Sequence, residues 1–199
     1  MRLRLAGWLA VLCAVSFCPA AGGRQSGPSP LDPERSRFTI FVSKSGVFSA
    51  FGHDHTIEAR IVEGKLSRGG SPSVMLRVDS RGLRVLDADL SPDKRAEVQQ
   101  TMLGPEVLDA ARFPEIRFQS TRIEPAGAGR WSVSGDLTLH GVTKPVAANV
   151  TWQDGVYRGT ARLKQRDFGI QPVSAAGGTV RVKDEVKLDF EIYVLQPPS

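Results

Sequence analysis

The chain has only two cysteines among its 199 residues, Cys13 and Cys18, and both lie near its start. Two arginines stand among the first four residues, an apolar stretch follows over residues 5–17, and small residues come next. This order is typical of a secretory signal peptide, and the apolar stretch is too short to anchor a protein stably in a bilayer. We therefore expect residues 1–22 to be removed and the mature protein to be periplasmic or secreted, without a disulfide bond.

The sequence also lacks the short motifs of common enzyme classes. It contains no Gly-x-Ser-x-Gly nucleophile turn, no glycine-rich phosphate loop and no dinucleotide-binding fingerprint. Loss of the two leading arginines lowers the 26 basic residues to 24 against 21 acidic ones, so the net charge falls from +5 to +3. A charge this small and this dispersed excludes a dedicated nucleic-acid partner. We expect a protein that is not an enzyme and requires no cofactor.

Strict alternation of apolar and polar residues is what the chain has in abundance. Residues 180–194 place apolar side chains at nearly every even position, and residues 146–152 and 157–163 alternate in the same way. A period of two predicts antiparallel strands with one dry and one wet face. Asp154-Gly155 between two of these strands is a strong hairpin signal. So many strands of this kind predict a closed barrel or a sandwich.

One region departs from the alternation. Ser91 is a helix cap, Pro92 suits the first helical position, and Gly104 follows the last helical residue, so a short helix is expected between strands. Residues 23–36 are rich in Gly, Pro and Ser and are expected to form a flexible leader. The remaining residues, 37–196, are expected to form one domain.

Several motifs together resemble one family. They are Phe-Pro-Glu-Ile-Arg-Phe at 113–118, Gly-Asp-Leu-Thr-Leu-His-Gly-Val-Thr-Lys-Pro-Val at 135–146, and Arg-Asp-Phe-Gly-Ile at 166–170 with Val-Lys-Asp-Glu-Val at 182–186. With residues 45–55 they span nearly the whole mature chain, and the second motif is the specific one. The sequence resembles the YceI-like family of exported, lipocalin-like, polyisoprenoid-binding proteins.

The resemblance implies an all-β fold, an eight-stranded antiparallel barrel with a short helical insertion. It also implies an apolar ligand in the barrel, such as an isoprenoid, a quinone or a fatty amide. Small residues at inward positions, Ala148, Gly159 and Ala161, leave room for such a ligand, although they would equally fit the taper of a filled barrel. The side chains expected to contact the ligand are His53, His55, Leu137, Leu139, Ala148, Val150, Trp152, Ala161, Leu163, Leu188, Phe190 and Ile192. Transient membrane contact and a homodimer are further expectations.

The segment Gly52-His53-Asp54-His55 holds two histidines that share the parity of the apolar residues after them. Two inward imidazoles must find polar partners. Three interpretations remain open: contact with the polar head of a ligand, metal ligation by His53 and His55, or a structural role in which the imidazoles satisfy loop carbonyls near a barrel rim. The metal interpretation gives the alternative function, a metal-binding protein or metal-dependent enzyme.

Overall fold

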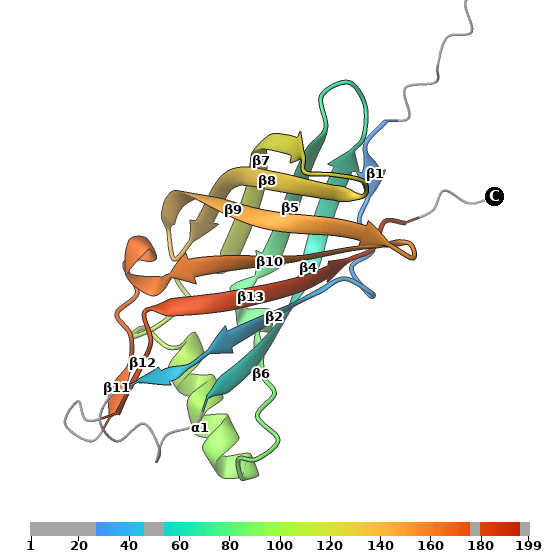
Figure 1. The fold of residues 1–199 in the computed structure, drawn as a ribbon. Helices are drawn as coiled ribbons and strands as arrows, with labels where there is room; N and C mark the ends of the chain where they lie inside the picture. The colour runs from blue at the N-terminus through green and yellow to red at the C-terminus, as the bar shows by residue number, and fades with distance from the viewer. Residues whose placement is uncertain (1–26, 46–53, 176–179, 196–199) are drawn as a thin grey trace, which may run out of the picture.

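The computed structural model describes residues 27–45, 54–175 and 180–195, and these residues form mostly β-structure (Figure 1). The expected signal peptide therefore lies outside the described residues. Eight antiparallel strands close into a barrel, in which β4 pairs with both β2 and β5, as the family resemblance implied. In spatial order they are β4 (His55–Ser67), β2 (Arg37–Val42), β13 (Glu185–Ile192), β10 (Val156–Lys164), β9 (Val142–Gln153), β8 (Arg130–Leu139), β7 (Glu115–Pro125) and β5 (Ser73–Asp79).

Shorter elements complete the described part of the chain. Strands β1 (Ser29–Pro30) and β6 (Arg84–Val85) pair with β4, and a separate small sheet consists of β3 (Lys44–Ser45), β12 (Val180–Val182) and β11 (Ser174–Ala175). The helical elements are α1 (Pro92–Leu103) and the 3₁₀ turns η2 (Ser80–Gly82) and η3 (Gln165–Phe168). Among the residues described, no helix has the length and apolar character needed to cross a bilayer.

Two tight turns set the register of the β8–β9 and β9–β10 hairpins. His140 and Gly141 have φ values of 51° and 74°, and Asp154 and Gly155 have φ values of 52° and 81°. Positive φ at both central residues gives a turn whose twist matches that of the flanking strands. The hairpin predicted from Asp154-Gly155 is confirmed, because Val156 pairs directly with Gln153.

The helix forms where its capping residues predicted it. The Ser91 side chain accepts a hydrogen bond from the Lys94 amide at 3.4 Å, and Gly104 ends the helix. Gln99 then fixes the helix to the barrel: its side-chain oxygen accepts from the Val85 amide and its amide nitrogen donates to the Leu83 carbonyl, both at 2.8 Å. A single polar side chain thus pairs with two backbone groups at the edge of β6, on the side away from β4 that its strand pairing leaves open.

Part of the expected flexible leader belongs to the barrel. β1 pairs with β4, and Leu31 bridges to Val194 and is only 3% exposed. Gly64 on β4 leaves the space that the Leu31 side chain occupies. A composition rich in Gly, Pro and Ser suggested mobility, but one apolar side chain and a few backbone hydrogen bonds are enough to attach the segment.

The two ends of the barrel differ. At one end, which we call the helix end, lie α1, η3 and the turn at His140-Gly141; at the opposite end lies the β9–β10 turn, on the right in Figure 1. The helix end holds much of the tightly buried core, including Phe168, which is 1% exposed. The core consists of Leu31, Phe38, Ile57, Ala59, Ile61, Val78, Leu83, Val85, Met102, Leu108, Ala110, Phe168, Ile170 and Ile192.

Candidate functional site

The inner face of the barrel is apolar, and the strand register shows which residues share it. Ala148 pairs with Val133 and Ala161, and Ala161 pairs with Leu188. Directly opposite residues of antiparallel strands point to the same face of the sheet. The described residues that sequence reasoning expected to contact a ligand lie on this inner face, and they run along the barrel from His55 at the helix end to Trp152 at the other. His53 lies outside the described residues.

Burial of the inner face is uneven around the barrel. On β4, the inward residues Ile57, Ala59 and Ile61 are all buried. On β9, by contrast, no residue is fully buried, although the same alternation of inward and outward positions is clear. Inward residues on neighbouring strands are also only partly buried, namely Leu137, Leu139, Leu163, Leu188 and Phe190. The side of the barrel around β9 is therefore less tightly packed than the side around β4.

The space beside two inward glycines is filled by phenylalanine rings. A Cβ atom on Gly159 would lie 2.3 Å from the Phe190 ring, and one on Gly135 would lie 2.5 Å from the Phe118 ring. Gly159 was expected to leave room for a ligand, but its space is filled by its neighbour on β13. Of the three small residues, Ala148 and Gly159 are partly exposed, whereas Ala161 is buried.

His55 lies at the helix end and is paired with Asp87. The His55 Nδ1 atom is 2.6 Å from Asp87 Oδ2, and the side chains are 21% and 2% exposed. Asp87 Oδ1 accepts from the Thr56 amide at 2.8 Å, so both carboxylate oxygens have partners. Because an ionised carboxylate only accepts, the Nδ1 atom donates. The printed partner of the His55 ring is therefore a carboxylate rather than the loop carbonyls of the structural interpretation, and the other two interpretations of the histidine pair stay predictions.

Asp87 was missed by sequence reasoning, since it is 32 positions away from His55 and lies in no recognisable motif. Within the described residues, no three His, Cys, Asp or Glu side chains gather closely enough to hold a metal ion. His55 and Asp87 alone do not fit a resident metal, because both Asp87 oxygens already accept hydrogen bonds.

An aromatic cluster lies at the end opposite α1, which we call the aromatic end. The Tyr157 ring centroid is 4.6 Å from that of Trp152 and 6.1 Å from that of Trp131. The Arg68 Nε atom donates to the Tyr157 hydroxyl at 3.0 Å. Trp152 is 40% exposed, although its parity places it on the inner face. Tyr157 was not among the expected ligand contacts, but the alternation of residues 157–163 does give it inward parity.

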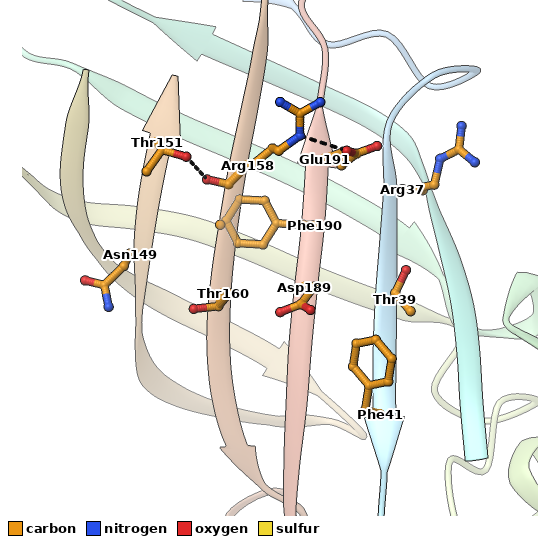
Figure 2. A pocket seen from close by; sticks show the side chains of 11 residues that line it. Arg37, Thr39, Phe41, Asn149, Thr151, Arg158, Thr160, Asp189, Phe190 and Glu191 are labelled. Atoms are coloured by element: carbon orange, nitrogen blue, oxygen red, sulfur yellow. Dashed lines mark hydrogen bonds and ion pairs between the residues drawn. The ribbon is translucent and has the colours of Figure 1, made fainter. Parts of the chain in front are cut away.

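The outer wall bears a shallow concavity of about 520 Å³ across β2, β13, β10 and β9 (Figure 2). Thr39, Asp189 and Thr160 face outward in one row, next to the ion pair of Arg158 Nε with Glu191 at 2.9 Å. The hydrogen bond to Glu191 raises the pKa of Arg158. These outward residues belong to the wet face of the strands and are separate from the inner face.

A second concavity, of about 450 Å³, lies at the helix end beside η3 and β12. Arg166, Arg181 and Lys183 line it together with Asp184. Asp184 has the parity of an apolar position, but its side chain bonds to the backbone of η3. Its Oδ1 atom accepts a hydrogen bond from the Arg166 amide at 2.9 Å.

Comparison with known proteins agrees with this geometry. Residues 30–194 match the YceI-like domain. The chain belongs to the YceI-like family. A UPF0312 protein of Vibrio cholerae is 33% identical over 114 residues, which cover 52% of this chain and 56% of that protein. A UPF0312 protein of Pseudomonas syringae pv. tomato is 40% identical over 86 residues, covering 38% of this chain and 45% of that protein. The chain thus spans about half the length of the curated relatives it matches.

Solved structures share the YceI-like fold at low sequence identity. BcnA of Burkholderia cenocepacia superposes with a TM-score of 0.60 at 20% identity and covers 83% of this chain and 99% of its own. A polyisoprenoid binding domain from Saccharophagus degradans, implicated in plant cell wall breakdown, has a TM-score of 0.57 at 15% identity and covers 84% and 98%. At these identities the likeness establishes the barrel architecture alone.

Proposed function

We propose that this YceI-like chain is an exported, non-catalytic binder of a long apolar ligand, such as an isoprenoid or a quinone, held inside the barrel. The observation that supports the proposal is the inner face of β9, which is apolar and yet only partly buried, as are the inward residues Leu137, Leu139 and Leu163 on the strands beside it. Apolar side chains that a folded protein leaves incompletely packed gain free energy when an apolar ligand covers them. The polyisoprenoid binding domain from Saccharophagus degradans shares the fold and agrees with this class of ligand.

The energetics favour a ligand that is recognised by its chain. Burial of apolar surface contributes about 0.8 kcal/mol per CH₂-sized group. A tail of several isoprene units therefore binds without any strong polar contact. Specificity for the tail would come from the length and width of the space along β8, β9 and β10, and the polar head would lie near an end of the barrel.

The decisive experiment combines ligand identification with a variant that blocks the interior. Protein purified from its own host is expected to show an organic adduct in native mass spectrometry. Ala148→Trp should abolish that adduct, because the indole would project from β9 into the interior. Ala147→Trp is the matched control, since Ala147 is the exposed neighbour on the outer face and the adduct should remain.

The same pair of variants tests whether the interior has space. If it has, Ala148→Trp should change the free energy of unfolding by less than about 1 kcal/mol, as would the control. A filled interior would instead resist the larger side chain, and overpacking costs about 1–3 kcal/mol. A protein without an adduct whose Ala148→Trp variant is strongly destabilised would contradict the proposal.

The alternative function is metal binding through His53 and His55, and a histidine whose Nδ1 atom donates to a carboxylate, as His55 does, keeps its Nε2 atom available to a metal. Elemental analysis of protein from its own host provides the check. The proposal for an apolar ligand expects no stoichiometric metal, and a metal lost on His55→Ala would favour the alternative.

A further inference from the structure

The two ends of the barrel expose different chemistry. At the helix end Leu86 is 46% exposed, whereas at the aromatic end two large apolar side chains, Trp152 and Leu195, are 40% and 42% exposed. The strands that bear or precede them, β9 and β13, are both neighbours of β10. At the helix end the inward side chains are covered instead, by α1 and η3 and by residues that follow them, such as Leu108, Ala110 and Ile170. An apolar ligand therefore meets fewer side chains in its way at the aromatic end.

The residues of the aromatic end are of the kind that sits at the surface of a bilayer. Tryptophan and tyrosine combine an apolar ring with one polar atom and favour the headgroup level of membranes. Arg68 is exposed, and its Nε atom donates to the Tyr157 hydroxyl, so an exposed cation lies beside the aromatic cluster. At a lipid surface, an arginine can pair with the lipid phosphates while the aromatic ring beside it lies at the apolar boundary.

We infer that the aromatic end docks on a lipid bilayer and is the portal through which the apolar ligand enters and leaves the barrel. The inference rests on the proposed function, because it concerns how that ligand arrives. A long apolar chain is nearly insoluble in water, since each CH₂-sized group costs about 0.8 kcal/mol to expose. Its source is therefore a membrane, and direct transfer needs the open end of the barrel to touch the lipid.

The test measures docking apart from ligand binding. The probe is a vesicle of phosphatidylcholine and phosphatidylglycerol whose acyl chains carry bromine, which quenches tryptophan fluorescence on close approach. The mature protein expected after removal of residues 1–22 has Trp131 and Trp152 as its emitting residues. We expect quenching that is mostly lost in Trp152→Phe and largely kept in Trp131→Phe, since Trp152 is the more exposed ring.

A pair of matched variants decides between the two ends. Trp152→Ser combined with Leu195→Ser should weaken vesicle binding at least about tenfold, because it removes two large apolar side chains from the contact. Leu86→Ser is the control, since Leu86 is 46% exposed but lies at the helix end, and it should bind vesicles as the parent does. An equal loss in both variants, or no loss in the double variant, would overturn the inference.

Failure of the inference and failure of the proposed function give different results. Ligand uptake from detergent solution does not need a membrane, so Leu195→Ser alone, which changes none of the expected ligand contacts, should still acquire ligand there. If the parent protein takes up ligand from detergent but neither binds vesicles nor shows quenching, the docking inference is wrong and the proposed function stands. If it binds vesicles but acquires no ligand from either source, the proposed function is wrong.

Discussion

The helix end and the aromatic end belong to the same barrel, but they are built in different ways. At the helix end, Phe168 is almost completely buried and Asp87 has a partner for each oxygen. At the aromatic end, Trp152 remains substantially exposed while its ring packs on Tyr157. Eight strands fix the wall at both ends equally, so the difference arises from what the connecting segments add. The helix and the 3₁₀ turns cover one end of the barrel, whereas aromatic rings lie at the other end.

The largest expected effect separates the two ends by their contribution to stability. Phe168→Ala should lower the free energy of unfolding by about 3–5 kcal/mol, because it opens a cavity in tightly packed surroundings. Trp152→Ala should cost only about 1 kcal/mol, since much of the ring is already in water. Urea denaturation followed by circular dichroism measures both. Equal losses would show that the two ends are packed alike.

A second prediction concerns the polar contacts of the helix end. Asp87→Ala should cost about 2–3 kcal/mol, because the Thr56 amide and the His55 ring would each lose an acceptor in a poorly hydrated place. Asp87→Asn keeps one acceptor oxygen and should cost clearly less. The same denaturation experiment compares them, and an Asp87→Ala protein as stable as the parent would refute the structural role of the pair.

The third prediction concerns Gly159 on β10. We expect no room for a larger residue there, although inward side chains on this side of the barrel are only partly buried. Gly159→Ala would place Cβ 2.5 Å from the Asn149 carbonyl oxygen as well as against the Phe190 ring, and should cost about 1–3 kcal/mol. Phe190→Leu in the same chain should recover part of the loss. Gly69→Ala is the control, because nothing lies within 4 Å of its added Cβ, and it should leave stability nearly unchanged.

The smallest effect is a pH dependence at the surface of the helix end. Hydrogen bonds from Arg81 to Asp79 hold the pKa of Asp79 below its ordinary value of 3.8, while desolvation opposes this in part. A carboxyl group with a lowered pKa stabilises the fold above 3.8 and loses that contribution as the pH falls through its folded pKa. Arg81→Met should therefore raise the pKa of Asp79, measured by carbon NMR, and lower stability at neutral pH but not in strong acid. An Asp79 pKa unaffected by the substitution would contradict this.

Local patterns predicted much of the fold. The alternation at 180–194 corresponds to β12 and β13, the Asp154-Gly155 signal corresponds to the β9–β10 turn, and Ser91 caps the helix. Each of these features depends on residues close together in the chain, where periodicity and turn chemistry act directly. The inward parity of the expected ligand contacts follows from the same rule.

Features that depend on contacts between distant residues were not predicted. Leu31 is attached to the barrel because Gly64 leaves space for it, and His55 is held by Asp87 from another segment. Gly159 offers no room to a ligand, because Phe190 from β13 already lies against it. The sequence around each of these residues does not predict which distant residue it contacts.

The sequence by itself determined the strands, their inward faces, the helix and the family, because hydrophobic alternation and turn residues are local properties. Only the tertiary structure decided which stretch of the inner face is tightly packed and which end of the barrel is covered. That outcome depends on where α1 and η3 pack and on which side chains fill the space beside each glycine. Packing depends on side chains from several strands at once, so it cannot be read from the sequence of any single strand.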